Sequence, residues 1–178
     1  MRDRLRFSNQ NVDIQSYALH HQDMEQSLRL YFSSDASSFD LRFAGYQPDK
    51  VREEMDTRLN ELEFASALTV LAAVEGAFRI DYLQRCYRRE RDPISKKLRA
   101  IYKERQDRAR LEEDILNIWK QYANGSSRII GDLIGAFKFR DWLAHGRYWV
   151  PKLGRKYDYL TIYALSARAL DSFPLRGP

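Results

Sequence analysis

The feature of this sequence that most constrains its fold is a stretch of about forty residues without a helix breaker. It runs from Pro48, which suits the first position of a helix, to about Glu90, and only Gly76 interrupts it. Such a helix is long for a globular domain, and Gly76 is a position at which it can bend. We therefore predict one long helix here, with small residues in its second half that allow another helix to approach closely: Ala65, Ala67, Ala72, Ala73 and Ala77.

Helical periodicity covers most of the remaining chain. It predicts helices over residues 15–32, 93–110, 111–122, 130–145 and 157–173, and a loop over 33–47. Asn124-Gly125 is expected to end the helix over 111–122, and Ser126 or Ser127 to cap the helix that follows. The adjacent residues His20 and His21 are predicted at the surface.

The 178 residues are long enough for one domain with its own core, and 44% apolar residues exclude a disordered chain. Residues 1–14 are polar and are predicted to form a flexible arm. The sequence therefore predicts a single all-α domain over residues 1–178. We expect an antiparallel bundle of about five to six helices, with one long helix and a projecting basic helical hairpin.

Positive charge is concentrated after the long helix. The whole chain carries a net charge of +5, whereas residues 85–110 contain eleven basic and four acidic residues, a net charge of +7. Such a run either faces solvent or binds a nucleic-acid phosphate backbone without reading the base sequence. The candidates for RNA binding in this segment are Arg85, Arg88, Arg89, Lys96 and Lys97.

Composition also argues against several classes of protein. One cysteine, Cys86, forms no internal disulfide, and with only three histidines a dedicated zinc site is not expected. Any hydrolytic chemistry is therefore predicted to be metal-independent, with no cofactor. No apolar run resembles a secretory signal or reaches the length that spans a bilayer. We expect a soluble cytoplasmic protein with no membrane partner.

The stretch around Arg140 continues an apolar helix face with charged groups, which must be paired or must face a cleft or a partner. Asp141 and His145 are four residues apart, so the carboxylate can accept a hydrogen bond from the imidazole and orient it. Gly146 suits the end of this helix. A purely structural alternative is an Asp141–His145 pair with Arg140 in a salt bridge. The apolar positions that precede are Ile130, Leu133, Ile134 and Phe137.

Glu75 directly follows the apolar part of the long helix, and Arg79 lies four residues further on. Two interpretations remain open for this carboxylate. It either forms a surface pair with Arg79 or holds Arg140 or His145 in place.

The run Arg140-Asp141-x-x-x-His145, followed by Gly146, resembles the signature of the HEPN superfamily (higher eukaryotes and prokaryotes nucleotide-binding domains). That signature is an arginine, four to six intervening residues and a histidine, with a polar residue after the arginine. The resemblance covers about a dozen residues by motif and the whole domain by its helical architecture. It implies a metal-independent endoribonuclease whose site forms at a homodimer interface, in a toxin or antiphage factor that commonly accompanies a nucleotidyltransferase-type antitoxin.

Carried over to this chain, the resemblance makes Arg140 the phosphate binder, His145 the proton-transfer residue and Asp141 the group that orients it. Lys138, Arg147 and Tyr148 flank the site and are further candidates for RNA contacts. RNA suits such a site because its 2′-hydroxyl is an internal nucleophile, so that an acid and a base suffice for cleavage. Two alternatives are a HEPN domain that binds RNA or a nucleotide without cleaving it, and a helical adaptor for protein interactions.

Overall fold

The computed structural model describes residues 4–8, 10–122 and 127–177, and within them every regular element is helical. The described residues form seven α-helices, one 3₁₀ turn and one π-helical turn, so the predicted all-α class is confirmed. No helix in the described ranges is both long and apolar enough to cross a lipid bilayer.

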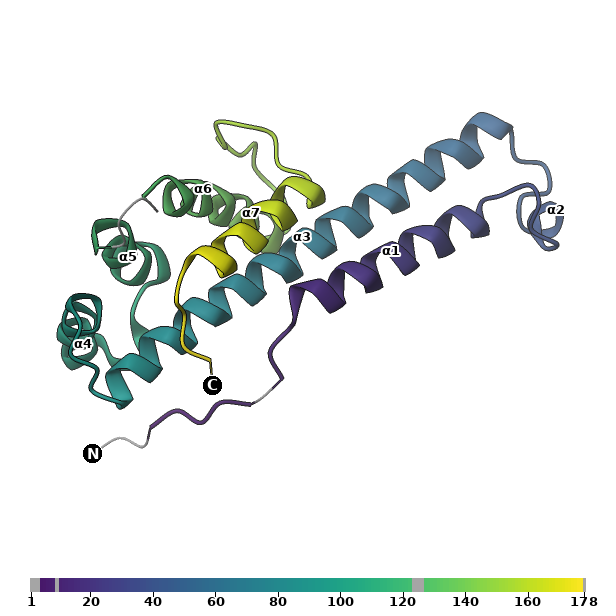
Figure 1. Cartoon of the computed structure of the whole chain (residues 1–178). Helices are drawn as coiled ribbons and strands as arrows, with labels where there is room; N and C mark the ends of the chain where they lie inside the picture. The colour runs from purple at the N-terminus through teal and green to yellow at the C-terminus, as the bar shows by residue number, and fades with distance from the viewer. Residues whose placement is uncertain (1–3, 9, 123–126, 178) are drawn as a thin grey trace.

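Helix α3 (Pro48–Tyr87) is the axis of the molecule. It has 40 residues with Pro48 at its first position, as predicted, and is about 60 Å long at 1.5 Å per residue. Helices α1, α4, α6 and α7 all pack against it (Figure 1). Gly76 does not interrupt it.

Helix α1 (Ile14–Tyr31) runs antiparallel to the N-terminal half of α3, and the two project beyond the rest of the molecule (Figure 1). The predicted loop between them contains the short helix α2 (Phe39–Arg42). The tip of this hairpin has a small hydrophobic cluster of its own, built from Phe32, Phe43 and Val51.

His21 on α1 is buried, so its predicted surface position is wrong. Its ring stacks on Tyr159 with centroids 3.7 Å apart, and its Nδ1 lies 2.8 Å from Ser66 Oγ. Helical spacing alone did not reveal that Ser66 of α3 and Tyr159 contact this side of α1.

The main core lies between the C-terminal half of α3 and four further helices. These are α4 (Pro93–Arg105), α5 (Asn117–Tyr122), α6 (Ser127–Ala144) and α7 (Tyr159–Ser172). Phe78, Trp119, Phe137 and Ile162 are among the side chains that they bury completely. Residues 124–126, predicted to end one helix and cap the next, lie outside the described residues.

The basic hairpin differs from its prediction in two ways. Helix α4 ends at Arg105 rather than near Arg110, because Gln106 takes a positive φ of 53° and a 3₁₀ turn (Gln106–Arg108) follows. A π-helical turn (Leu111–Leu116) then leads into α5. Helix α4 also packs on α3 and α5 through the buried Leu98, so the projecting part of the molecule is the α1–α3 hairpin.

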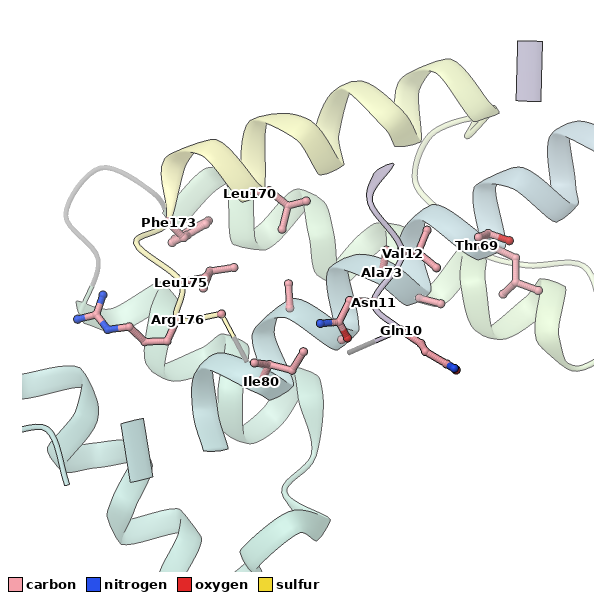
Figure 2. Close-up of a pocket in the computed structure, with 15 residues that line it drawn as sticks. Gln10, Asn11, Val12, Thr69, Ala73, Ile80, Leu170, Phe173, Leu175 and Arg176 are labelled. Carbon is pink, nitrogen blue, oxygen red and sulfur yellow. The ribbon is translucent and has the colours of Figure 1, made fainter. Parts of the chain in front are cut away.

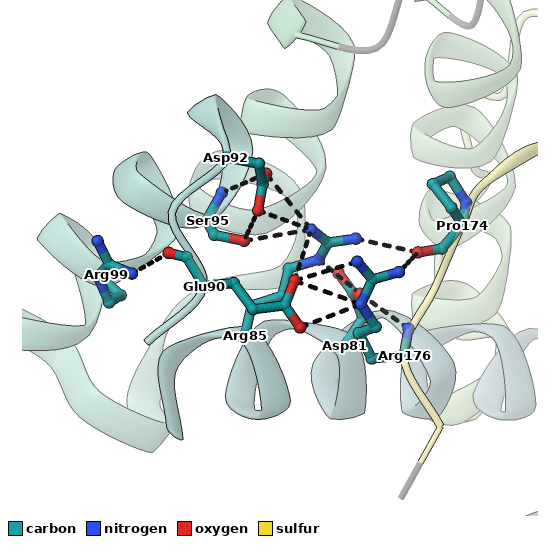
Figure 3. A network of polar contacts seen from close by, with 8 residues as sticks. All are labelled: Asp81, Arg85, Glu90, Asp92, Ser95, Arg99, Pro174 and Arg176. Atoms are coloured by element: carbon teal, nitrogen blue, oxygen red, sulfur yellow. Dashed lines mark hydrogen bonds and ion pairs between the residues drawn. The ribbon is translucent and has the colours of Figure 1, made fainter. Parts of the chain in front are cut away.

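A buried polar network joins α3, α4 and the C-terminal segment (Figure 3). Its centre is Arg85, which is only 2% exposed, so its predicted role as an RNA contact is wrong. Its Nε donates to Asp81 Oδ1 at 2.7 Å, and its Nη1 donates to Ser95 Oγ at 3.2 Å. Its Nη2 donates to the carbonyl oxygen of Pro174 at 3.0 Å.

The network extends through Arg176 of the C-terminal segment. The Arg176 backbone N–H donates to Asp81 Oδ1 at 2.9 Å, and its guanidinium donates to Glu90 Oε2 at 3.1 Å. Three segments that are distant in sequence are thus tied together by charge-assisted hydrogen bonds.

A groove of about 570 Å³ lies between α3, the end of α7 and the N-terminal arm (Figure 2). Three of the five small residues predicted to admit a neighbouring helix, Ala72, Ala73 and Ala77, line this groove, whereas Ala67 is buried in the core. The small side chains therefore leave part of α3 open rather than covered by another helix.

We expect Arg85→Met to lower the free energy of unfolding by roughly 3–5 kcal/mol, because Asp81 would stay buried without its cation. Urea-induced unfolding measures this change. The matched control is Arg58→Met, which breaks an exposed ion pair with Glu54 and should cost at most about 1 kcal/mol. Equal losses in the two variants would contradict a special role for the buried network.

The Glu90–Arg176 contact makes stability depend on pH. Hydrogen bonds from Arg176 hold the pKa of the Glu90 carboxyl below its usual value. A carboxyl whose pKa is lowered in the folded state stabilises the fold above its unfolded-state pKa, and that stabilisation is lost as the pH falls through the folded-state pKa. The stability difference between wild type and Glu90→Gln should thus be largest near neutral pH and should decrease as the pH falls through the lowered pKa of the Glu90 carboxyl. A difference that stays constant in urea titrations over this range would refute the assignment.

Candidate active site

The C-terminal end of α6 carries the residues of the Arg-His motif, and its geometry is fixed by the cap. Gly146 has a φ of +78°, its N–H donates to Leu143 O at 3.3 Å, and the N–H of Arg147 donates to Trp142 O at 3.0 Å. These two bonds satisfy carbonyls of the last turn in a left-handed cap. The predicted role of Gly146 in ending the helix is confirmed, and it places His145 at the helix end.

Arg140 is held in place by α3. Its Nη2 donates to Glu75 Oε2 at 2.5 Å, while the other oxygen of Glu75 accepts a hydrogen bond from Arg79 Nε at 2.7 Å. Arg79 in turn donates to the carbonyl oxygen of Ala109 at 3.0 Å. Both contacts considered for Glu75 from the sequence are therefore present, and its predicted contact with Arg140 is confirmed.

Arg140 also has a weaker partner and an unused donor. Its Nη1 lies 3.3 Å from Asp141 Oδ1, and the Asp141 side chain is 47% exposed. The Nε of Arg140 is buried and has no hydrogen-bond partner among the described residues. The guanidinium is thus anchored on one side by Glu75 and only loosely paired on the other.

His145 does not bond the Asp141 carboxylate, so that prediction is wrong. Its Nδ1 lies 2.7 Å from the backbone carbonyl oxygen of Asp141, because the imidazole at the helix end folds back over the last turn and the carboxylate turns toward Arg140. A carbonyl oxygen can only accept, so in this contact Nδ1 carries the proton. In the neutral ring Nε2 is then the unprotonated nitrogen, and the side chain is exposed.

Glu112, in the π-helical turn, lies in the same electrostatic environment and was missed from the sequence. Burial raises the pKa of its carboxyl, as does the Asp141 carboxylate, whereas Lys138 and Arg140 lower it. The acidic run Glu112-Glu113-Asp114 after Leu111 was its signal in the sequence. The spacing of a regular helix does not predict which of these three carboxylates lies near Arg140. The backbone here is instead a π-helical turn, which is frequent at functional sites.

The residues that flank the motif have different environments. Lys138 is exposed. Arg147 is engaged by Glu61 of α3 through two hydrogen bonds of 2.7 and 3.0 Å. Tyr148 is 83% exposed. Of these three predicted contacts, Lys138 and Tyr148 are available to a ligand, whereas Arg147 must first leave a carboxylate.

The basic segment is divided between interior and surface. Arg85 is buried in the network described above, whereas the other four predicted RNA contacts are exposed: Arg88, Arg89, Lys96 and Lys97. In the part of the chain that the structure describes, no three His, Cys, Asp or Glu side chains gather into a group that could hold a metal ion.

No family model matches this chain, and none of the curated proteins or solved structures compared with it is similar enough to count as a match.

The Glu75–Arg140 contact can be measured by a double-mutant cycle with Glu75→Gln and Arg140→Gln. We expect a coupling energy of roughly 1–2 kcal/mol in urea unfolding, because both side chains are mostly buried, with 20% and 25% exposed. The Glu75–Arg79 cycle is the matched comparison and should give less, because Arg79 is 38% exposed. A coupling energy near zero for Glu75–Arg140 would show that α3 does not position the guanidinium.

Proposed function

We propose that this protein is a metal-independent endoribonuclease that cleaves RNA by attack of the 2′-hydroxyl. The products are a 2′,3′-cyclic phosphate end and a 5′-hydroxyl end. The observation that carries the proposal is the state of His145: Nδ1 is tied to a backbone carbonyl, and the exposed ring keeps Nε2 for a substrate. A histidine held in one tautomer at a helix end, five residues after an anchored arginine, is suited to proton transfer at a phosphodiester.

In the proposed reaction Nε2 of one His145 removes the proton of the 2′-hydroxyl, and the oxygen attacks the adjacent phosphorus. The bond to the 5′-oxygen breaks, and a second group donates the proton that this leaving oxygen requires. Arg140 stabilises the charge that develops on the phosphate oxygens. The Arg140–Asp141 contact is longer, at 3.3 Å, and the Asp141 side chain is 47% exposed, so a phosphate can replace Asp141 while Glu75 keeps the guanidinium in place.

The second proton-transfer group is proposed to be His145 of another copy of the chain, in a symmetric homodimer with the active site at the interface. The loop that follows His145 supports this arrangement, because Tyr148 is 83% and Val150 90% exposed. Trp149 between them is 38% exposed, and a contiguous exposed apolar patch is typical of a protein interaction site. The resemblance to HEPN domains further favours a toxin or antiphage role, with a nucleotidyltransferase-type antitoxin as partner.

The proposal is tested by incubating purified protein with mixed RNA in EDTA and analysing the new ends. Wild type should produce 2′,3′-cyclic phosphate and 5′-hydroxyl ends. His145→Ala should lower the rate by roughly 100-fold or more, because it removes the proton-transfer group. Arg140→Ala should lower it by a similar factor, because it removes the cation at the phosphate.

The matched control for the histidine is His20→Ala, which removes an exposed histidine from α1 and should leave the rate unchanged. RNA that is retained but never cut would support a non-cleaving RNA-binding protein instead. Full activity in His145→Ala would exclude the proposed mechanism.

A further inference from the structure

A second concave site lies where α3, α4 and the N-terminal arm meet. It has a volume of about 560 Å³, within the range of small-molecule sites. Cys86 and two tyrosines line it together with five cationic side chains, Arg4, Arg89, Arg91, Arg99 and Lys103. We call it the cationic pocket.

The charges of the cationic pocket are not neutralised by the protein. No carboxylate lines it, and none of its five cations forms an ion pair with a described residue. Arg99 donates only to the backbone carbonyl of Glu90 (Figure 3). The neighbouring Arg85 and Arg176, by contrast, are both paired with carboxylates. Five like charges around one hollow repel one another, and a bound anion relieves that repulsion.

Arg89, which lines this pocket, has a left-handed backbone conformation. Arg89 has a φ of +53° in the left-handed cap that ends α3, where its N–H donates to Cys86 O and the N–H of Glu90 donates to Arg85 O. The equivalent cap of α6 uses Gly146, which adopts this conformation without steric cost. A side chain other than glycine is unfavourable there, and such strain is typically retained where it serves a site.

The tyrosines add hydroxyl groups and fix the arm. Tyr87 Oη accepts a hydrogen bond from the backbone N–H of Leu5 at 3.1 Å, and the guanidinium of Arg4 lies 5.1 Å from the centre of the Tyr87 ring. Tyr102 stands edge-on to Tyr87 with ring centroids 5.9 Å apart. The arm thus adds the fifth cation to a site formed by two helices.

We propose that the cationic pocket binds a compact anion with two or three linked phosphate groups, as in a nucleoside di- or triphosphate or inorganic tripolyphosphate. A single phosphate brings only about two negative charges and leaves most of the five cations unpaired. Linked phosphates bring more charge into the same small volume. An extended strand is held along a groove rather than in one concave pocket, so the geometry favours a small molecule. This inference does not depend on the proposed ribonuclease activity.

The test is titration calorimetry of the full chain with inorganic tripolyphosphate, ATP and AMP at about 0.15 M salt, where weak surface attraction is screened. Tripolyphosphate and ATP should both bind saturably, and AMP roughly tenfold more weakly or worse. Equal affinity for tripolyphosphate and ATP identifies the phosphate chain as the recognised group. Tighter binding of ATP identifies a nucleotide as the source. Absence of saturable binding to either overturns the proposal.

Arg89→Gly separates ligand binding from fold stability. It should raise the melting temperature, because glycine relieves the left-handed strain, and weaken tripolyphosphate binding by roughly tenfold or more, because one cation is lost. The control is Arg88→Ala, which removes the adjacent exposed charge that does not line the pocket and should change the affinity by less than about twofold. Lys103→Ala is a second pocket variant with unstrained backbone and should weaken binding like Arg89→Gly. Equal losses in Arg88→Ala and both pocket variants would indicate nonspecific attraction and overturn the assignment.

Discussion

The buried Arg85–Asp81 pair is the interaction on which the arrangement of this molecule depends. Asp81 is completely buried, and burial raises the pKa of its carboxyl, so the charged pair depends on Arg85 Nε and the Arg176 backbone N–H, which both donate to its Oδ1. The same guanidinium bonds Ser95 at the start of α4 and the carbonyl of Pro174 after α7. Hydrophobic contacts are not directional, whereas these bonds fix the direction in which α4 and the C-terminal segment leave the core. Part of the positive charge of the basic segment is therefore internal and structural.

Helix α3 connects the candidate active site with the cationic pocket. Glu75, which holds Arg140, and Cys86, which lines the pocket, are eleven residues apart, which corresponds to about 16 Å along the axis and about 20° around it. Both sites thus rest on one side of the same helix. The segment from Tyr102 to Glu112 runs beside them, because Tyr82 bonds Gln106 O and Arg79 bonds Ala109 O. Tyr102 and Lys103 at the start of this segment line the cationic pocket, and Glu112 at its end lies in the electrostatic environment of Arg140.

Local signals in the sequence were sufficient to predict the long helix, its start at Pro48 and the cap at Gly146, because each of these features depends on neighbouring residues only. The Glu75–Arg140 contact was one of two open interpretations, and the position of Glu75 directly after the apolar run suggested it. The burial of Arg85 was not predictable from charge density, which does not tell which arginine finds Asp81, Ser95 and Pro174 around it. The predicted bond between His145 and the Asp141 carboxylate was wrong for a related reason. The backbone carbonyl and the carboxylate of Asp141 are both possible acceptors, and Arg140 attracts the carboxylate. Glu112 was missed because a helix of regular pitch was assumed where the backbone is π-helical.

The small cluster of Phe32, Phe43 and Val51 at the tip of the α1–α3 hairpin is separate from the main core. One continuous helix therefore spans two regions with very different numbers of buried side chains. Regions with few buried contacts open locally at a lower free energy than the whole fold. We therefore expect amide hydrogen exchange to be faster at the tip than around Phe78 and Trp119, which are buried in the main core. Sequence changes at the tip can then accumulate with little effect on the half of α3 that supports both sites, so the hairpin is the part of this fold that is free to diverge.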